Sequence, residues 1–407
     1  VLPIDENFNP LRMGILYGVD TRAVKEIDEL NAQFGEDTIF NATANCLSSQ
    51  STGPKILWIK KNEPEVYKKA RWFVDATTFI VARLTNRVVI DHFSAGCMVP
   101  LYDPWTSKWS DKYCKEYINL DQLPEILWSN ELAGTITENA SKQTGLAVGT
   151  PVSVGTIDAG AEALSVSVTK PGEMMMMYGS TIFIIQVTHD PVRDPRLWYA
   201  PWLFPGVHAS MAGLATSGTL THWFRDQLSA DVSFGDLAAE AEAAPKGAKG
   251  LICLPYFSGE RTPIHDPHAR GAFFGLNLTH TRADMFRAVV EGIAAGTAHV
   301  LETYAEAGAS PAQVMAVGGG TKNALWLQAT SDFGGVAQQV CAKTVGASYG
   351  NAFLAAVAIG AAKPADIARW NPNERTVEPE AVPSYAVQYP LWKRLYAQTR
   401  DIMQALP

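Results

Sequence analysis

One stretch of 21 residues, 313–333, constrains the fold more than any other, because strand, glycine turn and helix follow one another directly in QVMAVGGGTKNALWLQATSDF. Val314–Val317 form an apolar run typical of a buried strand, and the spacing after the glycines favours a helix packed on a sheet. Glycines there permit close backbone approach to a ligand, and the helix N-terminus offers unpaired N–H groups to an anion or a base edge. Thr321 and Asn323 add polar side chains. A plain strand–helix turn explains the same pattern, so both interpretations stay open here.

Size and composition limit the class of protein. A chain of 407 residues is too long for one core, which predicts two domains. A net charge of −8 argues against nucleic acid or an anionic membrane as the main partner. The five cysteines are scattered and never spaced as CxxC, which favours reduced structural thiols in a cytoplasmic protein. No apolar run approaches the length of a membrane span.

The first half predicts an α/β domain. We expect a strand in Val1–Arg12, a second strand at Gly14–Asp20 that closes a hairpin with it, and a helix through Phe34. Ser48–Lys55 is predicted to be a loop and Phe73–Leu84 a helix. The Pro-, Trp- and Tyr-rich residues 99–128 indicate a docked insertion, and residues 151–168 a strand, a turn and a helix.

The second half begins after a turn cluster at Thr169–Gly172, which predicts domains at 1–170 and 171–407. Three strands are predicted first, then a helix, and then further strand–helix pairs. Four consecutive methionines precede the first tight turn and favour a buried strand over a metal site. The expected strands are Glu173–Tyr178, Ile182–Thr188, His208–Leu214, Leu251–Tyr256 and Val336–Cys341, and the expected helices are Gly218–Leu228, Thr281–Tyr304 (with a capping box of Thr281 and Asp284) and Ala347–Ile359.

Several chemistries have no support in the sequence. The Walker A and HExxH patterns are absent, and the turn at Gly318 lacks the third glycine of GxGxxG. His265 and His268 are three residues apart in a predicted loop, for which metal binding is the less favoured interpretation. What remains is a set of polar, glycine-rich turns at predicted strand ends in both halves.

Two of these turns suit phosphoryl transfer, which needs positioning, backbone donors, a cation and one base. Asp158 is a lone carboxylate after a predicted strand, and a helix N-cap is an equally good interpretation of it. Gly179-Ser180-Thr181 can cradle phosphates through its N–H groups, although an ordinary β-turn explains it equally well.

Taken together, the turns resemble the FGGY carbohydrate kinase family, with motifs most similar to xylulokinases. The matching stretches cover nearly the whole chain: 14–22, 155–160, 178–181, 213–226 (GLATSGTLTHWFRD), 257–276 (FSGERTPIHDPHARGAFFGL) and 317–332. This resemblance implies an α/β fold of two actin/hexokinase-like (RNase H-like) ATPase domains around a central cleft. The domains would be a sugar-binding N-terminal FGGY domain and a nucleotide-binding C-terminal one.

The resemblance also implies roles for individual residues. Asp158 matches the catalytic base and would contact the sugar and Mg²⁺, while Asp20 and Arg22 fall near the sugar pocket. The positions that match the ATP site are Gly179, Ser180, Thr181, Gly218, His222, Gly319, Gly320 and Asn323. Arg261 and Arg270 lie in a matching loop, where bracing with Glu260 and Asp266 is as good an interpretation as ligand contact.

One departure stands out. Family members begin with a strand–turn–strand carrying an Asp-x-Gly-Thr phosphate loop, and the sequence contains no such opening. We therefore expect that an N-terminal portion of the encoded protein precedes Val1. Without it, the expectation is a kinase-like fold without kinase activity and with an open-edged first sheet.

The predicted function is ATP- and Mg²⁺-dependent phosphorylation of a small sugar or polyol, with a ketopentose such as xylulose first. Closure of the domains about a hinge would exclude water. Ribulose, a pentitol, glycerol or gluconate are alternative acceptors, and a non-catalytic nucleotide- or sugar-binding protein of the same fold is the alternative class. Neither nucleic acid nor a membrane is expected as a partner, and a homodimer is left open.

Overall fold

The structure is a computed structural model that describes residues 1–18 and 20–406. The chain forms two compact units. Unit 1 comprises Val1–Ser165, Val187–Ser210 and Val345–Ile367, and unit 2 comprises Val166–Gln186, Met211–Thr344 and Ala368–Pro407. The predicted boundary at residues 170 and 171 stays a prediction.

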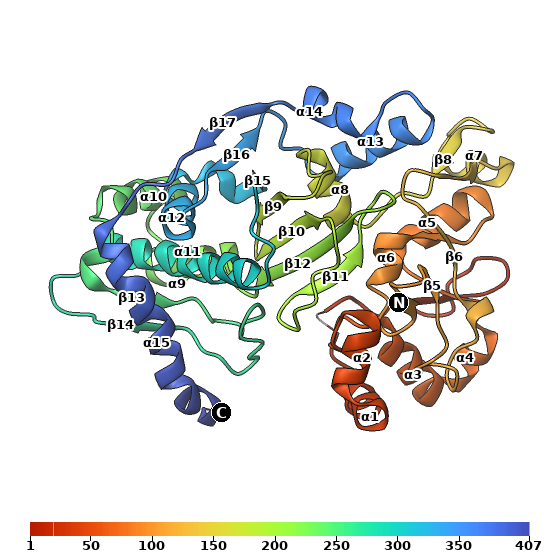
Figure 1. The fold of residues 1–407 in the computed structure, drawn as a ribbon, viewed down its shortest axis with the longest axis horizontal. Helices are drawn as coiled ribbons and strands as arrows, with labels where there is room; N and C mark the ends of the chain where they lie inside the picture. The colour runs from red at the N-terminus through yellow and green to blue at the C-terminus, as the bar shows by residue number, and fades with distance from the viewer. Residues whose placement is uncertain (19, 407) are drawn as a thin grey trace. The chain divides into compact units, whose positions relative to one another are not determined.

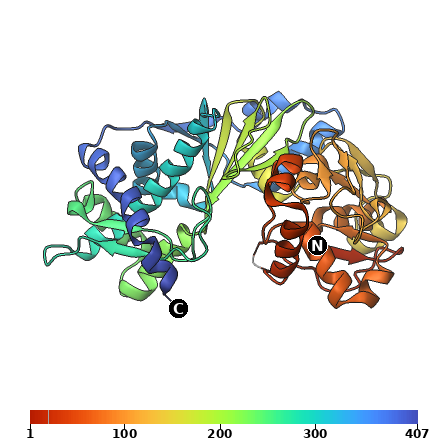
Figure 2. The same cartoon turned by 60° about the horizontal axis from the view of Figure 1, so that its bottom comes forward.

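Unit 1 surrounds a core of aliphatic and aromatic side chains that includes Ile56, Phe73 and Tyr117. Helix α1 packs against both α2 and α3, and the three lie in the red to orange-red part of the ribbon in Figure 2. The strands of this unit are β1 (Leu2–Ile4), β2 (Trp72–Val74), β3 (Val89–Asp91), β4 (Tyr102–Asp103), β5 (Lys108–Trp109), β6 (Glu125–Leu127), β7 (Leu132–Thr135), β8 (Pro151–Ser153) and β11 (Trp198–Pro201). Its helices are α1 (Val24–Phe34), α2 (Glu36–Thr43), α3 (Thr52–Asn62), α4 (Pro64–Lys69), α5 (Ala76–Thr85), α6 (His92–Gly96), α7 (Glu138–Thr144), α8 (Asp158–Ser165) and α13 (Ala347–Ala358).

Unit 2 is built on six neighbouring strands of a seven-stranded sheet, which run in the order β12-β10-β9-β15-β16-β17 (Figure 1). The central strand β15 pairs in parallel with β9 and with β16, and β9 pairs antiparallel with β10. Its strands are β9 (Glu173–Tyr178), β10 (Ile182–Thr188), β12 (His208–Leu214), β13 (Ile252–Leu254), β14 (Ala272–Phe274), β15 (Gln313–Val317), β16 (Gln338–Cys341) and β17 (Asn373–Val377). The end of β10 and the start of β12 belong to the 187–210 segment of unit 1. Its helices are α9 (Gly218–Leu228), α10 (Phe234–Ala243), α11 (Arg282–Glu306), α12 (Ala324–Gly334) and α15 (Pro383–Ala405), and α14 (Ile367–Trp370) begins on the last residue of unit 1.

The predicted elements of unit 2 are largely confirmed. The methionine strand is buried at Met174, Met175 and Met176, because β9 lies between β10 and β15. Helix α11 begins after Thr281, whose hydroxyl accepts a hydrogen bond from the Asp284 N–H while the Asp284 carboxylate accepts one from the Thr281 N–H. The short strand β14 was not predicted, and it pairs with β13 away from the main sheet.

The N-terminal hairpin prediction is wrong. β1 pairs antiparallel with β2, some seventy residues later in the chain, with Leu2 opposite Val74. The described residues between Gly14 and Asp20 contain no strand, and Val19 lies outside the described residues. Isolated hydrogen bonds hold this segment instead of a strand pairing. In one of them the Nζ of the buried Lys55 donates to the Leu16 carbonyl at 2.7 Å.

Two helix starts also differ from prediction. The Ser48–Lys55 loop ends early, because α3 begins at Thr52. The helix expected from Phe73 begins at Ala76, where the Asp75 carboxylate accepts the N–H of Thr78 and caps it. Phe73, which was predicted to begin the helix, lies in strand β2 instead.

Candidate active site

Asp158 is the first residue of α8 in unit 1, directly after the turn that follows β8. The turn begins at Gly155, whose φ of +73° favours glycine. The Asp158 side chain is exposed, and its Oδ1 accepts the N–H of Ala159 at 2.8 Å. The second carboxylate oxygen of Asp158 takes no part in that hydrogen bond.

Helix α8 packs closely against α13. A Cβ at Gly350 would lie 1.8 Å from the Ala161 carbonyl oxygen, so the two helices touch backbone to backbone. Glu162 follows Asp158 by one helical turn and is half-buried. Burial, and then the negative charge of Asp158, raise the pKa of Glu162 above its usual range. The helix face that carries Asp158 is therefore acidic.

A buried carboxylate supports the turn before Asp158. Asp91, at the end of β3, is 1% exposed. Its Oδ2 accepts the hydroxyls of Thr156 at 2.8 Å and Ser129 at 2.9 Å, and its Oδ1 accepts the N–H of Ser94 at 3.3 Å. Burial raises the pKa of Asp91 to about 6, although these hydrogen bonds oppose the shift.

Asp20 and Arg22 are paired with each other. Arg22 Nε donates to Asp20 Oδ1 at 2.8 Å and its terminal nitrogen donates to Oδ2 at 2.7 Å, a bidentate arrangement. The Arg22 guanidinium also lies 4.8 Å from the centre of the Trp58 ring. Hydrogen bonds from Arg22 lower the pKa of Asp20 to about 2. Their contact with a sugar stays a prediction.

In unit 2 the turn Gly179-Ser180-Thr181 packs on the start of α9. The Gly179 carbonyl accepts the N–H of Gly218 at 3.1 Å, and the Ser180 carbonyl accepts those of Ser217 and Thr219 at 3.2 and 3.1 Å. A Cβ at Gly218 would lie 2.4 Å from the Gly179 carbonyl oxygen. Gly218 thus permits close packing, and its own N–H is already bonded to the turn rather than aimed at a ligand.

The turn after β15 lies beside the end of β9. Gly318, with φ of +98°, has no space for a Cβ, which would meet the Tyr178 carbonyl oxygen at 2.6 Å. Gly320 is enclosed by the Tyr178 and Trp326 side chains, whereas a Cβ at Gly319 would meet no other atom within 4 Å. The two predicted glycine turns of unit 2 therefore lie at one edge of the sheet, because Val317 pairs with Met177.

Asn323 caps α12, since its Oδ1 accepts the N–H of Trp326 at 3.1 Å. Its Nδ2 is buried and has no hydrogen-bond partner within the described part of the chain. His222 lies exposed on α9, with its ring centre 5.3 Å from that of Phe234. Nucleotide contact at both positions stays a prediction.

The loop at 258–271 holds the strand end that leads into α9. Glu260 Oε1 accepts the N–H groups of Ala215 at 2.6 Å and Arg261 at 2.7 Å, and the Arg261 guanidinium donates to the Leu214 carbonyl at 2.7 Å. Among the described residues, Glu260 Oε2 has no partner. Burial raises the pKa of Glu260 to about 8. Arg270 donates only within its own loop in the bonds described, to the Pro267 and Ala269 carbonyls.

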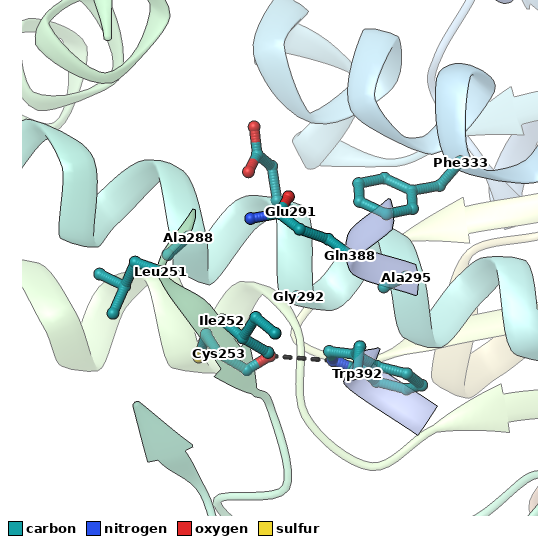
Figure 3. A pocket seen from close by; sticks show the side chains of 10 residues that line it. All are labelled: Leu251, Ile252, Cys253, Ala288, Glu291, Gly292, Ala295, Phe333, Gln388 and Trp392. Atoms are coloured by element: carbon teal, nitrogen blue, oxygen red, sulfur yellow. Dashed lines mark hydrogen bonds between the residues drawn. The ribbon is translucent and has the colours of Figure 1, made fainter. Parts of the chain in front are cut away.

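A cavity in unit 2 is separate from these turns. It lies among α11, β13, α12 and α15, and Figure 3 shows its lining, including Glu291, Phe333 and Trp392. Its volume is about 20 Å³, which suits a single water and not a sugar. Glu291 already accepts bonds from Arg287, Tyr385 and the Gly247 N–H. This cavity is part of the unit 2 core.

Two features are absent from residues 1–18 and 20–406. No three His, Cys, Asp or Glu side chains are grouped so as to hold a metal ion. No helix in that part of the chain combines the length and apolar character that crossing a membrane requires.

The fold and these turns define a two-domain α/β protein of the actin/hexokinase-like type, with glycine turns at strand ends. Comparison with known proteins identifies the family. Residues 1–165 match the N-terminal domain, and residues 174–359 the C-terminal domain, of the FGGY family of carbohydrate kinases. The chain belongs to this family and is a carbohydrate kinase.

Three relatives illustrate the match. The xylulose kinase of Bacillus subtilis (strain 168) is 28% identical over 99% of this chain and 82% of its own length. That of Escherichia coli (strain K12) is 28% identical over 98% and 83%. The crystal structure of xylulose kinase from Rhodospirillum rubrum superposes with a TM-score of 0.90 at 28% identity and covers 99% of this chain and 83% of that one.

Asp91 and Ser129 are site-supporting residues that sequence reasoning missed. The available signal was a carboxylate at the end of the apolar run 88–90, ahead of a short helix. That signal identifies a helix cap, and Asp91 does accept the Ser94 N–H. Nothing in the local sequence shows that Thr156 and Ser129 converge on it.

Proposed function

We propose that this kinase transfers the γ-phosphoryl group of ATP to a hydroxyl of a small sugar, with a ketopentose such as xylulose as the first candidate. The observation that carries the proposal is the family match over both domains, together with the xylulose kinases among the relatives at 28% identity. The kinases of this family use ATP, and we assign its binding to the glycine turns of unit 2.

We assign the acceptor chemistry to Asp158. In phosphoryl transfer the protein mainly positions the reactants and stabilises charge, and a carboxylate takes the acceptor proton. Asp158 suits this role because it is exposed at a helix start and one of its oxygens is free of the Ala159 bond. Asp20 and Arg22 are proposed to contribute to the sugar side as a rigid, paired unit.

We assign nucleotide binding to Gly179, Ser180, Thr181, Gly319, Gly320 and Asn323, with His222 and Gly218 beside them. Gly319 supports this because its surroundings are open, and Asn323 because its buried Nδ2 still has a hydrogen bond to give within the described structure. Gly218 supports it indirectly, by letting the 179–181 turn approach α9.

Magnesium fits this arrangement. Mg²⁺ in phosphate sites keeps several waters and is held by one or two carboxylates plus phosphate oxygens, without a full set of protein ligands. An exposed Asp158 next to the half-buried Glu162 is such a donor set. Asp158 would hold the ion, which would supply neutralisation of the phosphate charge.

The test is ADP release with ATP and a panel of pentuloses, pentitols, glycerol and gluconate, using the complete encoded protein. We expect one pentulose to turn over well above the other acceptors. Asp158→Asn should lower kcat by about 10²- to 10⁴-fold, because the base is lost. Asp190→Asn, a change at an exposed carboxylate, is the matched control. Bound ATP without turnover of any acceptor would contradict the proposal and favour a non-catalytic protein.

A further inference from the structure

Three segments far apart in the chain end at the Asp91 carboxylate. β3 pairs in parallel with β6, so that Asp91 lies opposite Leu127, and Ser129 follows two residues later. The backbone after β8 runs past the same place, since the Gly155 N–H donates to the Ser129 carbonyl at 3.2 Å. Thr156 is thereby brought to Asp91 from 65 positions away in the sequence.

The geometry is that of a buried acceptor surrounded by donors. Two hydroxyls and one backbone N–H point at a side chain that is 1% exposed. Burying a carboxylate without a cationic partner is costly, and removing it leaves its donors unpaired. Asp75, Cys97 and Tyr102 also lie near enough to interact electrostatically with Asp91, and none of them supplies positive charge. Capping α6 uses only the Asp91 Oδ1, so the cap does not account for the two hydroxyls that donate to Oδ2.

The position of Thr156 explains why a carboxylate is buried at Asp91. It stands two residues before Asp158, in the turn that begins at Gly155. We propose that Asp91 is a positioning residue for phosphoryl transfer: by holding the Thr156 hydroxyl it fixes the turn that aims the Asp158 carboxylate. Asp91 exchanges no proton with the substrate. This inference rests on the proposed function, because it takes Asp158 as the base. A displacement of about 1 Å in such a group costs on the order of 10²-fold in rate.

The kinetic test uses Asp91→Asn, Thr156→Val and the double variant, with Thr156→Ser as the matched control. In either orientation the Asn amide replaces one acceptor with a donor, and valine removes the hydroxyl while keeping the shape. We expect both single variants to lower kcat by about 10- to 100-fold while KM for sugar and ATP changes less than about threefold. The double variant should fall no further than the worse single one. Thr156→Ser should stay within about threefold of the wild type, because it keeps the hydroxyl.

A second measurement is independent of turnover. Hydrogen exchange of the amides at 155–160 should rise at least about tenfold in Asp91→Asn and Thr156→Val, with α11 unchanged. Unchanged exchange and wild-type kcat in a folded variant would overturn the inference, as would independent, multiplicative losses in the double variant. If the wild type phosphorylates no acceptor while exchange at 155–160 still rises, the proposed function fails and the holding role of Asp91 survives. If Asp91→Asn does not fold, Thr156→Val decides.

Discussion

The two units hold the turns to which we assign function in different ways. In unit 1, the turn before Asp158 is fixed by side chains, since the Thr156 hydroxyl reaches a carboxylate on another strand. In unit 2, the 179–181 turn is fixed by backbone bonds, with its carbonyls accepting the first N–H groups of α9. A buried carboxylate accepts hydrogen bonds near each turn, Asp91 in unit 1 and Glu260 in unit 2. Asp91 accepts mainly hydroxyls, whereas Glu260 accepts backbone N–H groups only in the bonds described.

This difference separates two functional demands. The turn proposed to bind phosphate would present its backbone N–H groups, and backbone hydrogen bonds and the missing side chain at Gly218 set its shape. A turn that presents a single carboxylate needs one direction fixed, and a side-chain hydrogen bond is enough. Unit 1 should therefore be sensitive to changes in side-chain chemistry, and unit 2 to changes in backbone space.

The largest effect is expected where unit 1 departs from that rule, at the contact of α8 with α13. Gly350→Ala places a methyl group 1.8 Å from the Ala161 carbonyl oxygen, so the helices must separate. Overpacking at backbone contacts costs about 3 kcal/mol or more, which predicts a fall of several degrees in Tm and loss of kinase activity. Scanning calorimetry measures it. Gly235→Ala, at a site with only the Ser233 hydroxyl near 3.9 Å, is the control.

A smaller and more specific effect is expected in unit 2. Gly218→Ala brings a methyl group within 2.4 Å of the Gly179 carbonyl oxygen and pushes the turn from α9. We expect a cost of roughly 2 kcal/mol in stability and an increase of at least about tenfold in KM for ATP, with KM for the sugar little changed. Steady-state kinetics with each substrate varied in turn tests this. Equal increases in both KM values would show that the turn does not serve the nucleotide separately.

The third effect concerns the acid of unit 2, and it is spread gradually over the pH range. The pKa of Glu260 is raised to about 8, so the folded state binds this proton more tightly than the unfolded chain does. Its contribution to stability is complete below the ordinary glutamate pKa and is lost as the pH rises through about 8. Glu260→Gln should remove this dependence, by up to roughly 1.4 kcal/mol per pH unit.

The comparison is the Tm of wild type and Glu260→Gln across pH 5 to pH 8. We expect the variant to gain on the wild type steadily as the pH increases, because Gln still accepts the Ala215 and Arg261 N–H groups without a buried charge. Parallel curves would show that Glu260 does not titrate in this window. Unlike Glu260→Gln, Asp91→Asn should disturb existing hydrogen bonds even at constant pH. It affects the bonds from the Thr156 and Ser129 hydroxyls as well as removing the charge.

Much of unit 2 could be predicted from sequence because its signals are local. The apolar run before Gly318 and the apolar spacing after it specify β15 and α12 without reference to the rest of the chain. The Thr281 and Asp284 pair likewise marks the start of α11. The glycine turns were predicted as sites from their residue types, and this assignment stays a prediction.

The errors lie where pairing is long-range. Residues 14–20 looked like the natural hairpin partner of the first strand, but β2 takes that place, because packing on the unit 1 core decides between candidate strands of similar local propensity. The short strands β11 and β14 carry too few residues for a periodic pattern.

The sequence by itself determined the family, the order of the main elements and the residue that is proposed as base. Only the tertiary structure decided what stands behind that residue. Asp91 lies 38 positions before Ser129 and 65 positions before Thr156, and no local sequence pattern links the three residues. They meet because parallel pairing of β3 with β6 aligns two strand ends and the third segment crosses them. Such a contact depends on long-range strand pairing, so it exists only once unit 1 has folded.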